Sequence, residues 1–116
     1  MILVRNVFHL KFGMAREAVA LWQEGLEVLQ KAGVVHDTRL MTDLTGPFYT
    51  LVAESTYDDL GAMERQLREE SQLPEWRAVY QRFVPMADSG YREVFTLVGS
   101  TVPSLPAAGA RAATTG

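Results

Sequence analysis

Two histidines, His9 and His36, are the side chains that first suggest metal or acid–base chemistry. Neither has a third ligand clustered with it at the spacing of a metal site. The sequence contains no cysteine, and it has neither a Ser-His-Asp pattern nor a glycine-rich phosphate loop. We therefore expect structural histidines, no metal and no cofactor, while thiolate zinc sites, disulfides and cysteine nucleophiles are excluded.

A second set of residues has the composition of a small-molecule site. Asn6 is the one non-ionisable polar side chain on an otherwise apolar alternation of the first predicted strand, and Phe8 follows on the same side. Trp22 and Trp76 belong to the helical segments expected to cover that side. An apolar pocket with one orienting hydrogen-bond group is typical of ligand sites. The alternative is that Asn6 is a buried amide satisfied within the core and the aromatic residues are core.

The other face of the same strand carries the polar residues Arg5 and His9. A later strand places Glu54 on its own polar face. A buried carboxylate needs a cation, and Arg5, His9 or Arg39 could supply it. We predict that Arg5, His9 and Glu54 form a polar group in a lumen between two sheets. Two roles stay open, an ion pair that fixes the register of a dimer and an acid–base pair in a pocket.

The elements that must position these residues are given by the apolar periodicity. Strands are predicted where β-branched and aromatic residues cluster, at 2–12, 34–44, 48–56 and 91–98. One helix begins at Ala15 and ends before Gly33. A second helical stretch begins after Asp58 and Asp59, is kinked or split at Pro74, and ends at 88–90.

This order is βαββαβ, which predicts an α+β, ferredoxin-like domain with a four-stranded antiparallel sheet and two helices on one face. Both faces of the first strand are largely apolar. The face of the sheet without helices would therefore expose apolar side chains unless another molecule covers it. A second copy of the chain, packed sheet against sheet, is the simplest cover. We expect a homodimer with a closed, isologous interface.

Composition limits the remaining possibilities. The chain has 116 residues, of which 47% are hydrophobic and 22% charged, and its formal net charge is −3. One domain over residues 1–99 is expected, followed by a flexible tail over 100–116 that is rich in Ala and Pro. The charge argues against nucleic acid, and no segment is long and apolar enough to be a membrane span. No targeting segment is visible, so cytoplasm is the default location.

Short fragments of the sequence are similar to a known family. The run Pro74-Glu75-Trp76-Arg77-Ala78-Val79-Tyr80, followed by Phe83 and Pro85, resembles the dimeric α/β-barrel superfamily, and within it NIPSNAP-type domains. The segment Tyr57-Asp58-Asp59-Leu60 resembles the same domains, and the likeness covers residues 2–98. It implies a dimeric α/β barrel. The superfamily also includes haem-degrading monooxygenases, but the second helical stretch contains no His to bind iron.

Two classes of function remain open at the level of the sequence. The first is a small homodimeric NIPSNAP-like protein that binds a small apolar molecule in a cleft between sheet and helices. The second, implied by the resemblance, is a cofactor-free monooxygenase or isomerase of the antibiotic-biosynthesis monooxygenase type. Such an enzyme needs only to desolvate an electron-rich substrate and place a base beside it, so the lack of catalytic motifs is compatible with both classes.

Overall fold

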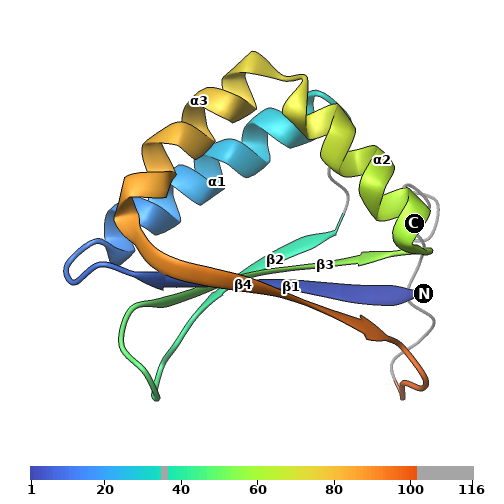
Figure 1. Cartoon of the computed structure of the whole chain (residues 1–116), viewed down its shortest axis with the longest axis horizontal. Coiled ribbons are helices and arrows are strands. Elements are labelled where there is room, and N and C mark those ends of the chain that lie inside the picture. The colour runs from blue at the N-terminus through green and yellow to red at the C-terminus, as the bar shows by residue number, and fades with distance from the viewer. Residues whose placement is uncertain (35–36, 102–116) are drawn as a thin grey trace.

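In the computed structural model, which describes residues 1–34 and 37–101, helices arch over one face of a twisted sheet (Figure 1). The elements, in chain order, are β1 (Ile2–Leu10), α1 (Ala15–Lys31), β2 (Thr38–Thr42), β3 (Thr50–Tyr57), α2 (Leu60–Ser71), α3 (Pro74–Phe83), the short 3-10 helix η1 (Val84–Met86) and β4 (Ala87–Thr96). His36 and the tail from 102 onward lie outside the described residues.

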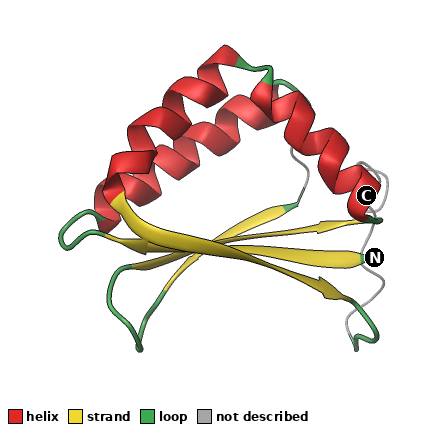
Figure 2. Ribbon diagram, in the orientation of Figure 1, coloured by secondary structure: helices red, strands yellow, loops and turns green. Residues whose placement is uncertain are grey.

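The four strands form one antiparallel sheet in the order β2-β3-β1-β4. All helices of the described chain lie on the same side of this sheet, and the other side is bare (Figure 2). The predicted α+β, ferredoxin-like architecture is therefore confirmed. A dimeric barrel needs a second chain, so that part of the expectation stays a prediction.

The predicted break in the second helical stretch is also confirmed, and local chemistry explains it. Asp59 caps α2, because its Oδ1 accepts a hydrogen bond of 2.8 Å from the backbone N–H of Ala62. Pro74 begins α3 at a position where a missing N–H costs nothing. The two helices consequently meet at an angle, so that α2 and α3 cover different parts of the sheet (Figure 1).

The start of β4 differs from the prediction. Residues 88–90 were expected to end the second helix, but the helix ends earlier, at η1, and these residues already belong to β4. Gly90 is required there for close approach. A Cβ atom at Gly90 would lie 3.0 Å from Cδ1 of Phe8 and 3.2 Å from the carbonyl oxygen of Val7. Asp88, Ser89 and Gly90 are therefore part of a strand beside an aromatic ring, whereas the sequence pattern predicted the end of a helix there.

The second strand is also shorter than the 34–44 predicted, since β2 spans Thr38–Thr42. None of the helices in the described part of the chain is long and apolar enough to cross a membrane. The domain boundary at 99 and the flexible tail stay predictions.

The core lies between the sheet and the pair α1 and α3. Its members are buried apolar residues from β1, α1, β3 and α3: Leu10, Ala18, Leu21, Trp22, Leu51, Ala53, Val79 and Phe83. A glycine in α1 lets the two helices approach. A Cβ atom at Gly25 would lie 2.7 Å from Cζ3 of Trp76, so only glycine lets the indole ring rest on α1.

Gly25→Ala should consequently displace Trp76 and lower the free energy of unfolding by about 1–3 kcal/mol, the usual cost of overpacking. Gly61→Ala in α2 is the matched control, because its added Cβ meets nothing closer than 3.4 Å. The control should be neutral or stabilise the helix by up to about 1 kcal/mol. Denaturant unfolding measures both, and equal stabilities of the two variants would contradict the packing described for Trp76.

Candidate ligand cleft

The structure brings the four residues of the predicted small-molecule site into one cleft. Asn6 and Phe8 line it from β1, Trp22 from α1 and Trp76 from α3. The cleft has a volume of about 620 Å³ and lies between the helix-covered side of the sheet and all three α-helices. Its size is within the range of small-molecule pockets.

One half of the cleft is aromatic. The Trp22 ring lies 5.6 Å, centroid to centroid, from the rings of Phe8, Trp76 and Phe83, and it meets the last two edge to face. Phe8 and Phe83 are 5.0 Å apart, also edge to face. These are the favoured geometries of aromatic pairs. A flat apolar molecule would find complementary ring faces and edges in this half of the cleft.

The indole nitrogen of Trp22 is unusual within this cluster. The residue is only 8% exposed, and its buried Nε1 has no hydrogen-bond partner among the described residues. A buried donor without an acceptor costs about 1–3 kcal/mol. The nitrogen is enclosed by protein atoms, so this cost belongs to the folded chain itself.

The other half of the cleft is polar, and Asn6 stands at its centre. Asn6 and Arg92 are opposite each other in the register of β1 and β4, and Nε of Arg92 donates a hydrogen bond of 2.7 Å to Oδ1 of Asn6. This bond fixes the orientation of the amide. The NH₂ group of Asn6 and the remaining N–H groups of Arg92 are therefore available as donors at the floor of the cleft.

Glu70 and Tyr57 complete the polar half. Burial raises the pKa of the Glu70 carboxyl, against the opposing effects of a hydrogen bond from Gln66 and the charge of Arg92. Burial, followed by the negative charge of Glu70, raises the pKa of Tyr57 to about 12. Tyr57 is therefore a neutral hydroxyl at ordinary pH, whereas Glu70 is a carboxyl whose ionisation is costly.

The sequence analysis did not identify Glu70, Tyr57 or Arg92 as site residues. A signal for Glu70 was present, since Met63, Gln66, Leu67 and Glu70 are spaced as one helical face, and polar residues interrupt its apolar stripe. No comparable signal marks Arg92. Its place beside Asn6 follows from the strand register, which the sequence does not specify.

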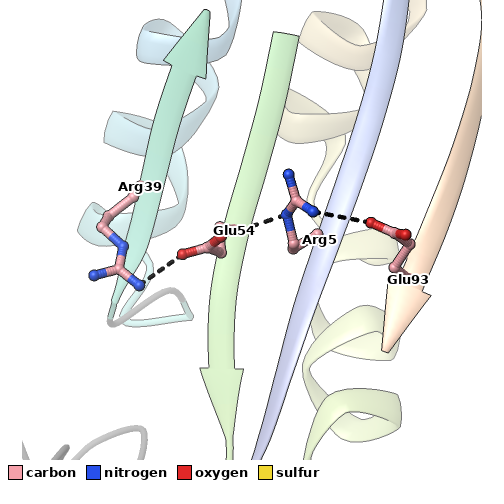
Figure 3. A network of polar contacts seen from close by, with 4 residues as sticks. All are labelled: Arg5, Arg39, Glu54 and Glu93. Carbon is pink, nitrogen blue, oxygen red and sulfur yellow. Dashed lines mark hydrogen bonds and ion pairs between the residues drawn. The ribbon is translucent and has the colours of Figure 1, made fainter. Parts of the chain in front are cut away.

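The second predicted set lies on the opposite, bare side of the sheet. There, a row of charges crosses all four strands in the order Arg39, Glu54, Arg5 and Glu93 (Figure 3). The nitrogen–oxygen distances along it are 2.7, 3.6 and 3.0 Å. Arg5 and Glu54 therefore meet, and Arg39 is the second cation on Glu54.

His9 occupies a different place from its two predicted companions. It is opposite Thr50 in the register of β1 and β3, and its ring lies 6.3 Å from that of Tyr91. In the described part of the chain, no three His, Cys, Asp or Glu residues are grouped as metal ligands. The structure thus joins two of the three residues predicted for the bare side and places the third beside an aromatic ring.

The sheet order and the helices on one face define a ferredoxin-like α+β protein with a ligand-sized cleft. Within this class, the NIPSNAP family model matches residues 5–100, so the chain belongs to the NIPSNAP family. This confirms the family resemblance found in the sequence. No curated protein matches the chain.

Solved structures agree with this assignment. An uncharacterized NIPSNAP domain protein from Burkholderia xenovorans is 20% identical, with 90% of this chain and 100% of that chain covered and a TM-score of 0.76. A NIPSNAP family protein from Agrobacterium tumefaciens strain C58 is 15% identical, with 90% and 98% covered and a TM-score of 0.75. An antibiotic biosynthesis monooxygenase is 14% identical, with 85% and 100% covered and a TM-score of 0.66. At these identities the likeness shows the fold alone.

The raised pKa of Glu70 predicts a pH-dependent loss of stability. The native state holds this proton more tightly than the unfolded state, so stability should fall as pH rises through the raised pKa. Glu70→Gln removes the free-energy cost of ionising this partly buried carboxyl. The stability of the variant relative to the wild type should therefore increase as pH rises from about 4 to about 8. Denaturant unfolding at both pH values measures the difference. Glu69→Gln removes the same charge from an exposed neighbour, and an equal gain there would contradict the burial of Glu70 as the cause.

Proposed function

We propose that this protein is a homodimer that binds a small, apolar, aromatic molecule in the cleft between sheet and helices. The observation that carries the proposal is the composition of the cleft. Aromatic rings line one part of it, and a few hydrogen-bond donors, including Asn6 and Arg92, line the other. Such sites place most of the ligand on apolar surface and use few polar groups to fix its orientation.

Because the Nε1 atom of Trp22 is enclosed by protein atoms, the Trp22 indole contributes ring surface and no hydrogen-bond donor to an occupant of the cleft. The three aromatic neighbours of Trp22 also favour a planar ligand, because further rings can add edge or face contacts to the same cluster.

Tryptophan fluorescence tests the proposal directly, because both tryptophans of the chain line the cleft. The bicyclic ketone 2-tetralone should quench this fluorescence saturably. Asn6→Ala should weaken binding by roughly 10-fold, equivalent to about 1.4 kcal/mol for one lost hydrogen bond. Phe48→Ala is the control, since Phe48 is a 79% exposed aromatic residue outside the cleft.

Two results would count against this site. If 2-tetralone causes no saturable quenching of the wild type, the proposed aromatic cleft is wrong. If Asn6→Ala lowers the melting temperature and leaves binding unchanged, Asn6 is a satisfied core amide, the alternative that the sequence left open.

The homodimer is supported by the bare side of the sheet. Its apolar side chains include Met41, Tyr91 and Phe95, which are 38%, 53% and 45% exposed. The row of charges on the same side alternates in sign from strand to strand (Figure 3). A two-fold axis parallel to the strands would reverse this row and place each arginine opposite a glutamate. The bare side is therefore electrostatically complementary to a second copy of itself.

Sedimentation should accordingly give twice the chain mass of 12.9 kDa. Phe95→Asp should weaken association by about 2 kcal/mol, roughly 30-fold in Kd, because the interface would bury an unpaired carboxylate. Val98→Asp is a matched control at a 94% exposed position that follows β4. A wild type that stays monomeric at micromolar concentration with a folded circular-dichroism spectrum would refute the dimer.

A cofactor-free monooxygenase or isomerase is the second candidate function. The observation that favours it is Glu70, a partly buried carboxyl that lines the cleft together with several hydrogen-bond donors. The structural likeness to an antibiotic biosynthesis monooxygenase points in the same direction. Measuring oxygen uptake with a panel of quinols and anthrones tests the monooxygenase function. If the protein has this function, oxygen should be consumed faster than in the uncatalysed reaction. Uptake equal to that rate would exclude oxygenation of these substrates.

A further inference from the structure

The polar half of the cleft is lined by a single partly buried carboxyl group and several hydrogen-bond donors. Two carboxylates line the cleft, Glu70 on α2 and Asp88 at the start of β4, but Asp88 is exposed to solvent. The sheet opposite α2 contributes the NH₂ group of Asn6, the free N–H groups of Arg92 and the hydroxyl of Tyr57. The polar half of the cleft is thus lined by one potential base, Glu70, and several hydrogen-bond donors.

The protonation states of these groups are set by their surroundings. Arg92 is a permanent cation whose Nε donates to Asn6, which leaves its terminal nitrogens as further donors of a residue that lines the cleft. Tyr57 keeps its proton at ordinary pH, since its pKa is raised to about 12, so its hydroxyl can donate a hydrogen bond but is a weak acid. Arg92 from β4 is the charged group that acts on Glu70, and Gln66 on the same helix is neutral. Asp37 acts together with Glu70 on Tyr57. Glu70 is therefore the group in this set that can accept a proton.

We propose that Glu70 removes a proton from the carbon that links an aromatic ring to the carbonyl of a ketone, while Asn6 and Arg92 hold the carbonyl oxygen. The C–H bond breaks, its proton passes to the Glu70 carboxylate, and the released electron pair forms an enolate with its negative charge on oxygen. Return of a proton from Glu70 to carbon restores the ketone. The step needs no oxidant, reductant or metal. It rests on the ligand cleft of the proposed function and names its substrate class.

The class of substrate follows from the two halves of the cleft. The aromatic wall suits a ring, the donors at the floor suit an acceptor oxygen, and the carbon between ring and carbonyl is the one that both groups acidify. Donors held in place stabilise an oxyanion more than the carbonyl oxygen it comes from, and the hydrogen bond from Arg92 to Asn6 holds these two donor groups together in the lining of the cleft. A partly buried carboxylate is also a stronger base than one in water.

Deuterium exchange tests this inference with the same probe used for binding. The wild type in D₂O should speed the exchange of the protons at C1 of 2-tetralone, the carbon between its ring and its carbonyl, as followed by proton NMR. Glu70→Gln should lower the enzymatic rate by about 100-fold or more, the usual contribution of a general base, while 2-tetralone still quenches tryptophan fluorescence. Glu69→Gln, an exposed neighbour on α2, should keep both the rate and the quenching. The rate should rise with pH and level off once Glu70 is ionised.

The outcomes separate this inference from the proposed function. Quenching without faster exchange would overturn the proton transfer and leave the binding site intact. Neither quenching nor exchange would overturn both. An unchanged rate in Glu70→Gln would assign the proton transfer to another group. Arg92→Gln provides a second variant, which should slow exchange through loss of the cation at the carbonyl oxygen, with circular dichroism confirming that each variant is folded.

Discussion

The packing of Trp22 against the middle of the sheet is the interaction on which the rest of this structure depends. Its ring touches Phe8 of β1, Trp76 and Phe83 of α3, and so joins the sheet to two helices that are distant in sequence. Two glycines make the cluster possible, because Gly25 admits Trp76 and Gly90 admits Phe8. A Cβ atom at Gly25 would displace the ring of Trp76, and one at Gly90 would crowd the ring of Phe8.

The same cluster determines where the cleft can be. α1 and α3 are held close to the sheet by aromatic contacts, whereas α2 ends before the break at Pro74 and runs in another direction over the sheet (Figure 1). Gln66 and Glu70 of α2 line the cleft there. The cleft is therefore aromatic where the helices pack tightly and polar where α2 covers the sheet. This division explains why burial acts on Glu70 and Tyr57, which lie in the polar half, and why the donors gather beside them.

The pairing of β1 with β4 serves both sides of the sheet. Asn6 is opposite Arg92 on the helix-covered side, and the adjacent pair, Arg5 and Glu93, meets on the bare side. Since successive residues of a strand point to opposite faces, one register fixes the floor of the cleft and a link in the row of charges together. A shift of one residue would move both sets to the wrong side. The NIPSNAP fold thus couples the geometry of the cleft to that of the surface proposed for the dimer.

The sequence alone determined the order of the elements, the break at Pro74, and the side of β1 on which Asn6 and Phe8 lie, because these depend on local periodicity and on backbone chemistry within a few residues. Only the tertiary structure decided that Arg92 binds Asn6, that His9 lies beside Tyr91, and that Asp88 to Gly90 are part of a strand. It also decided that Glu70 is partly buried in the same cleft as Tyr57 and acts on its pKa. These facts depend on the register of β4 against β1 and on the angle of α2, which arise from contacts between residues far apart in the chain and leave no periodic signal in the sequence.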